Sequence, residues 1–259
     1  MKMLRREDAL HMLNKVPEVT LYFWIIKIMA TTVGETGADF LSFNLKFGLT
    51  GTSVVMAFLL SVFLFMQLRA KKYIPWLYWV SVVLISIVGT LITDNLVDNF
   101  GVTLETTTAV FGFALLATFA LWYAGEKTLS IHSIFTTKRE LFYWAAILFT
   151  FALGTAAGDL VAESMKLGYV HSALVFGAMI AAVTVVYYGF KANAVLAFWI
   201  AYVLTRPLGA SCGDWLSQPI ENGGLGLGTV ATSLMFLATI LGLVVFLSVT
   251  RRDVMPRTA

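Results

Sequence analysis

Four aspartates recur at the same position of a sequence pattern that occurs four times in the chain. Each aspartate follows an aromatic–Trp pair, and a glycine stands five positions before it. The copies read Phe23-Trp24…Gly34…Asp39, Tyr78-Trp79…Gly89…Asp94, Tyr143-Trp144…Gly154…Asp159 and Phe198-Trp199…Gly209…Asp214. Every copy lies in an apolar segment, where an ionisable side chain is costly and marks a functional site by default.

Further acids stand one helical turn from three of these aspartates: Glu35 before Asp39, Asp98 after Asp94 and Glu163 after Asp159. Positions four apart share a helix face, and like charges there repel each other. Such pairs are tolerated better when they share a cation or hold a proton. Oxygen ligands with almost no Cys or His suit hard cations such as Mn²⁺, Mg²⁺ or Ca²⁺. The predicted ligands are Asp39, Asp94, Asp159, Asp214 and Glu35.

Two basic residues interrupt the same apolar segments, Lys27 in the first copy and Arg206 in the fourth. We expect them to be counter-charges to the carboxylates, which would make a charge-balanced site that exchanges one ion or proton for another. The alternative for these cations is an ordinary buried ion pair that fixes helix register. The alternative for the aspartates is bonding to the turns between paired helices at the outer interface.

The glycines and tryptophans of the pattern have structural explanations. Small residues let membrane helices approach closely, so the glycines are expected at helix contacts. Trp is enriched at membrane–water interfaces, so the tryptophans are expected as interfacial anchors. The glycines are Gly34, Gly89, Gly154 and Gly209, and the tryptophans are Trp24, Trp79, Trp144 and Trp199.

Long apolar helices must position these residues. The 259-residue chain is 59% hydrophobic and 13% charged, which excludes an ordinary soluble domain. Runs of about 20 apolar residues, enough to cross a bilayer, fall near 19–42, 51–69, 74–96, 104–124, 142–163, 170–190, 194–217 and 228–250. The runs do not alternate as barrel strands do. The expected fold is therefore all-α, a polytopic membrane protein with eight transmembrane helices.

The helices form repeats. Successive aspartates of the pattern are separated by 55, 65 and 55 positions, which indicates a two-helix unit duplicated twice. Because each unit crosses twice, all four insert in parallel. One membrane domain, 1–259, is expected, with repeats at about 19–70, 74–125, 139–190 and 194–250.

The placement of basic residues predicts the orientation. Outside the spans, the side opposite the chain ends carries only Lys46 and Lys166, and the other Lys and Arg residues fall on the side of the ends. By the positive-inside rule, both termini are cytoplasmic. The segment before Pro17 lacks a signal-peptide pattern, so the first helix is expected to direct insertion.

Several functional classes have no support in the sequence. The chain has no Ser/His/Asp set, zinc-ligand spacing or nucleotide fingerprint, and the Gly-rich stretch 222–228 lacks the Lys-Ser/Thr of a phosphate loop. We therefore expect no enzyme, no cofactor other than a divalent cation as substrate, and no nucleic-acid partner. The expected partners are the lipid bilayer and a small cation or protons, and a homo-oligomer stays open.

The repeated units resemble a family of bacterial inner-membrane proteins of unknown function. That family has four tandem repeats, each with two transmembrane segments and a characteristic Trp, and the resemblance covers about Val16 to Thr250. Segments 15–20, 32–35 and 205–209 are similar to its signatures. It implies a multi-pass protein of the bacterial inner membrane. A looser likeness is to manganese and calcium exporters with Glu-x-Gly-Asp motifs, although Ala156 and Ser211 stand here in place of the Glu.

Three functions remain open. The first is a secondary transporter of a small cation, a divalent metal that exchanges for protons. The second is a non-transporting membrane scaffold or stress-associated module, in which the aspartates are structural. The third is an exporter of organic cations, which needs an aromatic cage such as Phe43, Phe100 and Trp215 would supply.

Overall fold

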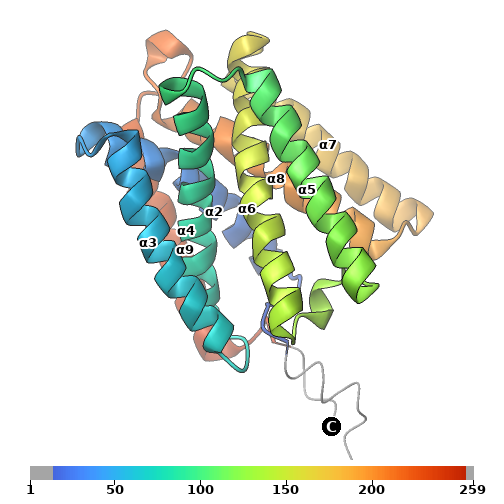
Figure 1. Ribbon diagram of the computed structural model, residues 1–259. Helices are drawn as coiled ribbons and strands as arrows, with labels where there is room; N and C mark the ends of the chain where they lie inside the picture. Colours follow the sequence, from blue (N-terminus) through green and yellow to red (C-terminus); the bar gives the residue numbers. More distant parts are fainter. Residues whose placement is uncertain (1–13, 255–259) are drawn as a thin grey trace, which may run out of the picture.

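The computed structural model describes residues 14–254 and contains eight long helices. Residues 14–254 contain no strand, so the all-α prediction is confirmed. The helices are α2 Leu21–Asp39, α3 Gly48–Arg69, α4 Pro75–Asp94, α5 Leu104–Glu126, α6 Thr137–Asp159, α7 Tyr169–Phe190, α8 Ala194–Ser217 and α9 Gly228–Thr250 (Figure 1). Seven are long and apolar enough to cross a membrane. The exception is α2, which carries Lys27 and Glu35.

The four helices that carry the repeated pattern form a closed inner ring. In this ring α2 packs against α4, α4 against α6, α6 against α8, and α8 against α2. The second helix of each repeat lies outside the ring on the inner helix of the following repeat: α3 on α4, α5 on α6, α7 on α8, and α9 on α2. The chain is therefore a quasi-fourfold bundle, in which the four helices that carry the pattern surround one central axis.

The four pattern glycines are the contact points of the inner ring. A Cβ at Gly89 would lie 2.5 Å from the Cβ of Phe151, and similar collisions would occur in every copy. The colliding partners are Ser86 for Gly34, Phe151 for Gly89, Arg206 for Gly154 and Thr31 for Gly209. These partners all stand three positions before the glycine of their own repeat. Each glycine thus accepts an equivalent residue of the next repeat, which lets the helix backbones approach closely.

The aromatic–Trp pairs form a layer near the start of the inner helices. The aromatic residue of each repeat packs on the Trp of the next, with ring centroids 5.6 Å apart for Phe23–Trp79 and for Tyr78–Trp144. The same contact joins Tyr143 to Trp199 at 6.2 Å and Phe198 to Trp24 at 5.7 Å. Trp79, Trp144 and Trp199 are buried and only Trp24 is half-buried. Three of the four rings therefore pack within the bundle, and the interfacial depth of this layer stays a prediction.

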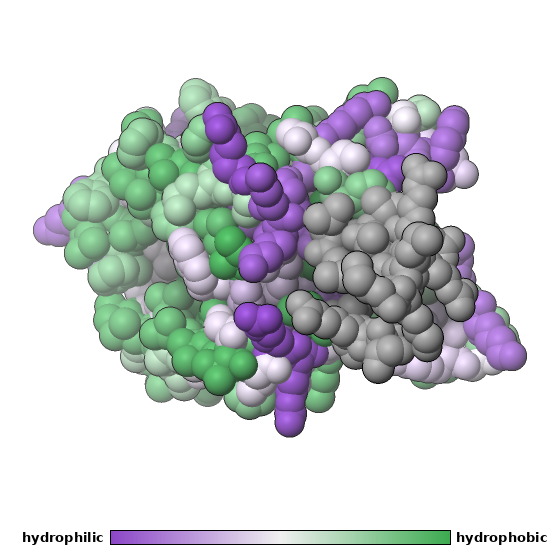
Figure 2. Space-filling model, turned by 90° about the horizontal axis from the view of Figure 1, so that it is seen from below, coloured by the Kyte–Doolittle hydropathy of each residue, from purple (hydrophilic) through white to green (hydrophobic). Residues whose placement is uncertain are grey.

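Both ends of the described chain lie at one end of the bundle, hereafter the termini end (Figure 1). There the backbone N–H of Glu18 donates to the carbonyl of Asp253 at 3.0 Å, and that of Lys15 donates to the carbonyl of Ile134 at 3.0 Å. The Lys15 ammonium makes a buried ion pair with Glu140 at 2.6 Å. Hydrophilic residues run across the face of this end, and hydrophobic residues cover its flank (Figure 2).

The opposite end, hereafter the carboxylate end, carries the pattern aspartates. Asp39, Asp94 and Asp159 are the last α-helical residues of α2, α4 and α6. Each is followed by a π-helical turn of five residues, at Phe40–Asn44, Asn95–Asn99 and Leu160–Ser164. Such turns are rare and often occur at functional sites. In the fourth copy α8 instead continues past Asp214 as an α-helix.

Candidate cation site

Three acids from three repeats meet on the axis at the carboxylate end. Glu35 of α2, Asp159 of α6 and Asp214 of α8 each offer a carboxylate oxygen, and these oxygens lie within 4.8 Å of one another. Glu35 and Asp214 are 7% exposed, and Asp159 is half-buried. The ring explains this cluster, because helices far apart in the sequence face the same axis. Asp159 and Asp214 are equivalent positions, and Glu35 stands one turn before the equivalent Asp39. Three of the five predicted ligands therefore come together.

The two remaining predicted ligands stand beside this cluster. Asp39 and Asp94 are half-buried at the same end of the bundle and are not part of the trio. Their charges are nevertheless within electrostatic range of Glu35. They add negative potential around the trio and surround its approach from solvent.

Arg206 lies directly beneath the trio and is fully buried. Its Nη2 donates to Glu35 Oε2 at 2.8 Å, to Thr155 Oγ1 at 2.6 Å and to Thr90 Oγ1. Glu35, Thr90 and Thr155 occupy the same position of repeats one, two and three. The rigid guanidinium fork suits several fixed acceptors at once. Arg206 thus joins all four repeats at the centre of the ring, and it is the predicted counter-charge of Glu35.

The charge of the trio and its arginine suits a divalent cation. With all groups ionised, three carboxylates and one guanidinium leave a formal charge of about −2 at the site. Oxygen ligands of Mg²⁺ or Ca²⁺ lie roughly 2.0–2.6 Å from the ion, so two oxygens on one ion stand up to about 4–5 Å apart. The spacing of Glu35, Asp159 and Asp214 fits that range. The residues present therefore suit one hard cation, with waters completing its shell.

Lys27 forms no ion pair with the trio. Its ammonium is fully buried, and among residues 14–254 no hydrogen-bond or ion-pair partner reaches it. It lies 4.3 Å from the ring centroids of both Phe151 and Tyr202. Lys27 makes no ion pair with a carboxylate of the described residues, because it stands two turns before Glu35 on α2 and aromatic rings enclose it there. Its role as a counter-charge stays a prediction.

Sequence reasoning missed Thr90, Thr155, Phe151 and Tyr202 as parts of the site. A signal for them was present in the repeat itself. Phe151 is the third-repeat equivalent of Arg206, and Tyr202 is the fourth-repeat equivalent of Lys27. Aligning every position of the four repeats, and not only the acids, would have placed these residues on the axis.

The axis is closed toward the termini end. Below Lys27, the hydroxyls of Tyr78 and Tyr143 bond to each other at 2.5 Å, and both residues are fully buried. Phe23 and Tyr202 fill the same layer at 1% and 0% exposure. The site therefore communicates with solvent at the carboxylate end, where Asp39, Asp94 and Asp159 are only half-buried.

Other sequence features lie away from the site. The Gly-rich stretch is a connection after the short 3₁₀ turn Ile220–Asn222. Phe43 is 61% and Phe100 is 75% exposed, so these two rings do not enclose the acids. Without them the aromatic cage expected for organic cations has no support.

These features define a class of protein, an all-helical bundle with seven helices long and apolar enough to cross a membrane. It builds one polar centre from four copies of a two-helix unit. The family model described as Repeat of Unknown Function (DUF347) matches the chain four times, at residues 22–73, 77–128, 142–193 and 197–253. The chain belongs to this family, and the resemblance to a four-repeat family of unknown function is confirmed. No curated protein and no solved structure matched the chain.

Proposed function

We propose that this protein carries a small divalent cation across a membrane in exchange for protons. The observation that supports the proposal best is the convergence of Glu35, Asp159 and Asp214 beside the buried guanidinium of Arg206. An intramembrane acid cluster of this kind is typical of ion and proton pathways. No zinc-type Cys or His ligand stands in the trio, so its oxygens favour Mn²⁺, Mg²⁺ or Ca²⁺.

Transport follows from the charge of the site. An ion that enters at the carboxylate end displaces protons from the acids, because metal ligands must be deprotonated. When the aromatic layer of Tyr78 and Tyr143 opens and the carboxylate end closes, the ion leaves and the acids take up protons again. Alternation of this kind couples the ion flux to an opposite proton flux.

In this proposal all eight long helices cross the bacterial inner membrane and both termini are cytoplasmic. The support is the charge distribution, because basic residues outside the helices gather at the termini end. The helix α2 is less apolar than the other helices, but it is one of the four helices of the inner ring and packs against α4 and α8. Its polar residues therefore face the axis and not lipid. The carboxylate end then faces outward.

The test is ion flux in proteoliposomes that contain the full chain. Wild-type protein is assayed with Mn²⁺, Mg²⁺, Ca²⁺ and Na⁺ in turn, with a pH-sensitive dye to follow protons. Glu35→Gln, Asp159→Asn and Asp214→Asn should each lower flux of the transported ion at least about tenfold, which is the loss typical even of residues that only orient metal ligands.

The matched control is Glu105→Gln, which removes an exposed acid at the start of α5. Its flux should equal that of the wild type. Transport proceeding unchanged in all three site variants would refute the proposal.

The scaffold is the second candidate, and one observation favours it. Arg206 donates hydrogen bonds to residues of the other three repeats. These bonds hold the ring together, in addition to balancing the charge of Glu35. A purely structural role predicts that Asp159→Asn and Asp214→Asn lower the unfolding temperature. A transport role predicts folded variants that have lost ion binding.

A further inference from the structure

Lys27 is a buried basic residue of the inner ring that is neither a ligand of the cation site nor an ion-pair partner of its acids. A fully buried ammonium without a hydrogen-bonding partner among residues 14–254 is an unusual arrangement, because a buried charge is ordinarily paired. Two aromatic faces at 4.3 Å stabilise the cation, but they accept no proton and supply no counter-ion. Lysine, unlike arginine, can also lose its proton when it is buried, and buried lysines therefore serve as general bases.

The surroundings of Lys27 hold one other charged group. On α8 it faces Arg206 and Tyr202. The first half of α4 carries Tyr78, and that of α6 carries Tyr143 and, at its start, Lys138, Arg139 and Glu140. Tyr78 and Tyr143 bond to each other, Glu140 pairs with Lys15, and Asp94 and Asp159 end the two helices. The remaining neighbour α9 has no charged residue.

Phe151 connects Lys27 to the cation site. The Lys27 ammonium lies 4.3 Å from the centroid of this ring, and the Arg206 guanidinium lies 5.6 Å from it. The Glu35 carboxylate balances the charge of Arg206, with Oε2 and Nη2 2.8 Å apart. An ion that binds Glu35 shares that carboxylate, so the charge of Arg206 is balanced less and the field at Lys27 becomes more positive.

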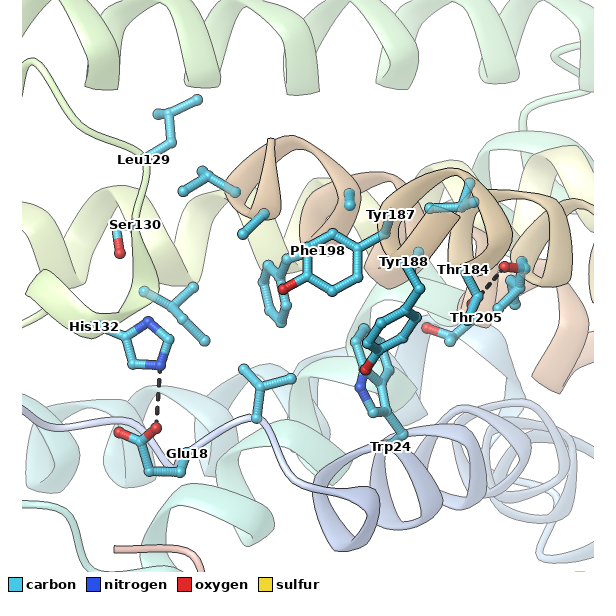
Figure 3. Close-up of a pocket in the computed structure, with 18 of the residues that line it drawn as sticks. Glu18, Trp24, Leu129, Ser130, His132, Thr184, Tyr187, Tyr188, Phe198 and Thr205 are labelled. Carbon is cyan, nitrogen blue, oxygen red and sulfur yellow. Dashed lines mark hydrogen bonds and ion pairs between the residues drawn. The ribbon is translucent and has the colours of Figure 1, made fainter. Parts of the chain in front are cut away.

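A cavity lies on the outer side of α2 and α8, the helices that carry Lys27 and Arg206. It encloses about 610 Å³ between α2, α7, α8 and the connection at 129–132. In Figure 3 His132 and Glu18 lie at one end of it, and Thr184 and Thr205 lie at the other, with aromatic rings between them. Its walls include Ile28, Ala201 and Thr205, the chain neighbours of Lys27, Tyr202 and Arg206.

We infer that Lys27 is the proton-exchange group of the cation site, losing one proton when a divalent cation binds to the trio and regaining it when the ion leaves. The inference rests on the proposed function and assigns one coupled proton to a residue outside the ligand set. In the step, one N–H bond of the ammonium breaks and the electron pair stays on Nζ. The proton passes to water, and a neutral amine remains between the two rings.

The experiment counts protons released on ion binding. Full-length protein in lipid nanodiscs is titrated with MnCl₂ by calorimetry, in two buffers of different ionisation enthalpy. Lys27→Met, which keeps the length and removes the charge, should still bind Mn²⁺ but release about one proton fewer per ion than wild type. Lys27→Arg keeps a fixed charge and should also release about one fewer, with weaker binding. The control Lys71→Met, at an exposed loop residue, should behave as wild type.

A second measurement separates this inference from the proposed function. In protein labelled at lysine Cε, the NMR signal that Lys27→Met removes reports the charge of Lys27 without any metal. Glu35→Gln removes the charge that balances Arg206 and should raise the neutral fraction of Lys27 at a fixed pH. If wild type binds Mn²⁺ and Lys27→Met releases as many protons, the inference fails and the transport proposal stands. If wild type binds no ion, the transport proposal fails, and an unchanged Lys27 signal in Glu35→Gln overturns the inference as well.

Discussion

Residues at equivalent positions of the repeats have diverged where they meet the axis. One position holds Thr31, Ser86, Phe151 and Arg206 in successive repeats, and all four contact a pattern glycine. The divergence has a physical cause, because four guanidinium groups around one axis would repel one another in a low-dielectric interior. One arginine, with Glu35 and two threonines as acceptors, satisfies the centre instead.

At the glycine contacts, adding a methyl group should destabilise the ring. Gly89→Ala places its Cβ 2.5 Å from that of Phe151 and 3.2 Å from the backbone nitrogen of Ala152, so a helix backbone must move. We expect a loss of about 1–3 kcal/mol in the free energy of unfolding, measured by thermal denaturation in detergent. The control is Gly242→Ala, where no atom lies within 4 Å and the higher helix propensity of Ala should leave stability equal or slightly higher. Equal losses at both positions would contradict the close-packing role of Gly89.

Removal of Arg206 should be more damaging than removal of its partner. Arg206→Met leaves Glu35 buried without its cation, and breaking a buried pair from one side typically destabilises by about 3–5 kcal/mol. The double variant Arg206→Met/Glu35→Gln should lose less than the sum of the single variants, because the second change removes the unpaired charge. A double-mutant cycle of unfolding free energies gives the coupling. Simple additivity would mean that the 2.8 Å contact contributes nothing specific.

At the scale of the elements, apolar length predicted the helices and repeat spacing predicted their order. The eight expected runs correspond to α2 through α9. Two features were not predictable from those signals. A belt tryptophan and a tryptophan that packs between helices have the same hydropathy, so the burial of Trp79 and Trp144 depends on the ring. The π-helical turns after Asp39, Asp94 and Asp159 depend on how the helix ends pack.

The connection at the termini end contains an element-scale pH response. His132 Nε2 lies 3.2 Å from Glu18 Oε2, and the hydrogen bond to Glu18 raises the pKa of His132 above its usual value. A raised pKa means that the pair stabilises the fold while His132 is protonated. The contribution is complete below the ordinary histidine pKa and is lost as the pH rises through the raised one. Because the pair is partly exposed, solvent screening keeps its contribution to the free energy of unfolding below about 1 kcal/mol.

The measurement is the unfolding temperature of wild type and His132→Gln between about pH 5.5 and pH 8, the range in which histidine titrates. Wild type should be the more stable protein at the acidic end, and the difference should vanish at the basic end. His171→Gln, at an exposed residue of α7, should show no such convergence. A difference that grows with pH would have the wrong sign for this pair.

At the scale of the whole molecule, the ring turns a linear duplication into one site. Sequence spacing placed the aspartates at equivalent positions but left open whether they converge, because a two-plus-two bundle satisfies the same pattern. The closure of α8 on α2 decides this and brings Asp214 to Glu35. The departures from symmetry then leave Asp39 and Asp94 outside the trio, which no rule of spacing could foresee.

In the proposed function, the orientation of the whole molecule determines from which side an ion would reach the trio, and this orientation can be tested with single cysteines. Cys212 is the only cysteine, so Cys212→Ser gives a background without thiols. Lys46→Cys lies in the connection between α2 and α3 at the carboxylate end, and Lys71→Cys lies between α3 and α4 at the termini end. If the basic loops are cytoplasmic, a membrane-impermeant maleimide should label Lys46→Cys in intact spheroplasts and Lys71→Cys only after the membrane is opened. The opposite pattern would place the half-buried Asp39, Asp94 and Asp159 on the cytoplasmic side, so that the conformation described here would load its ion from the cytoplasm.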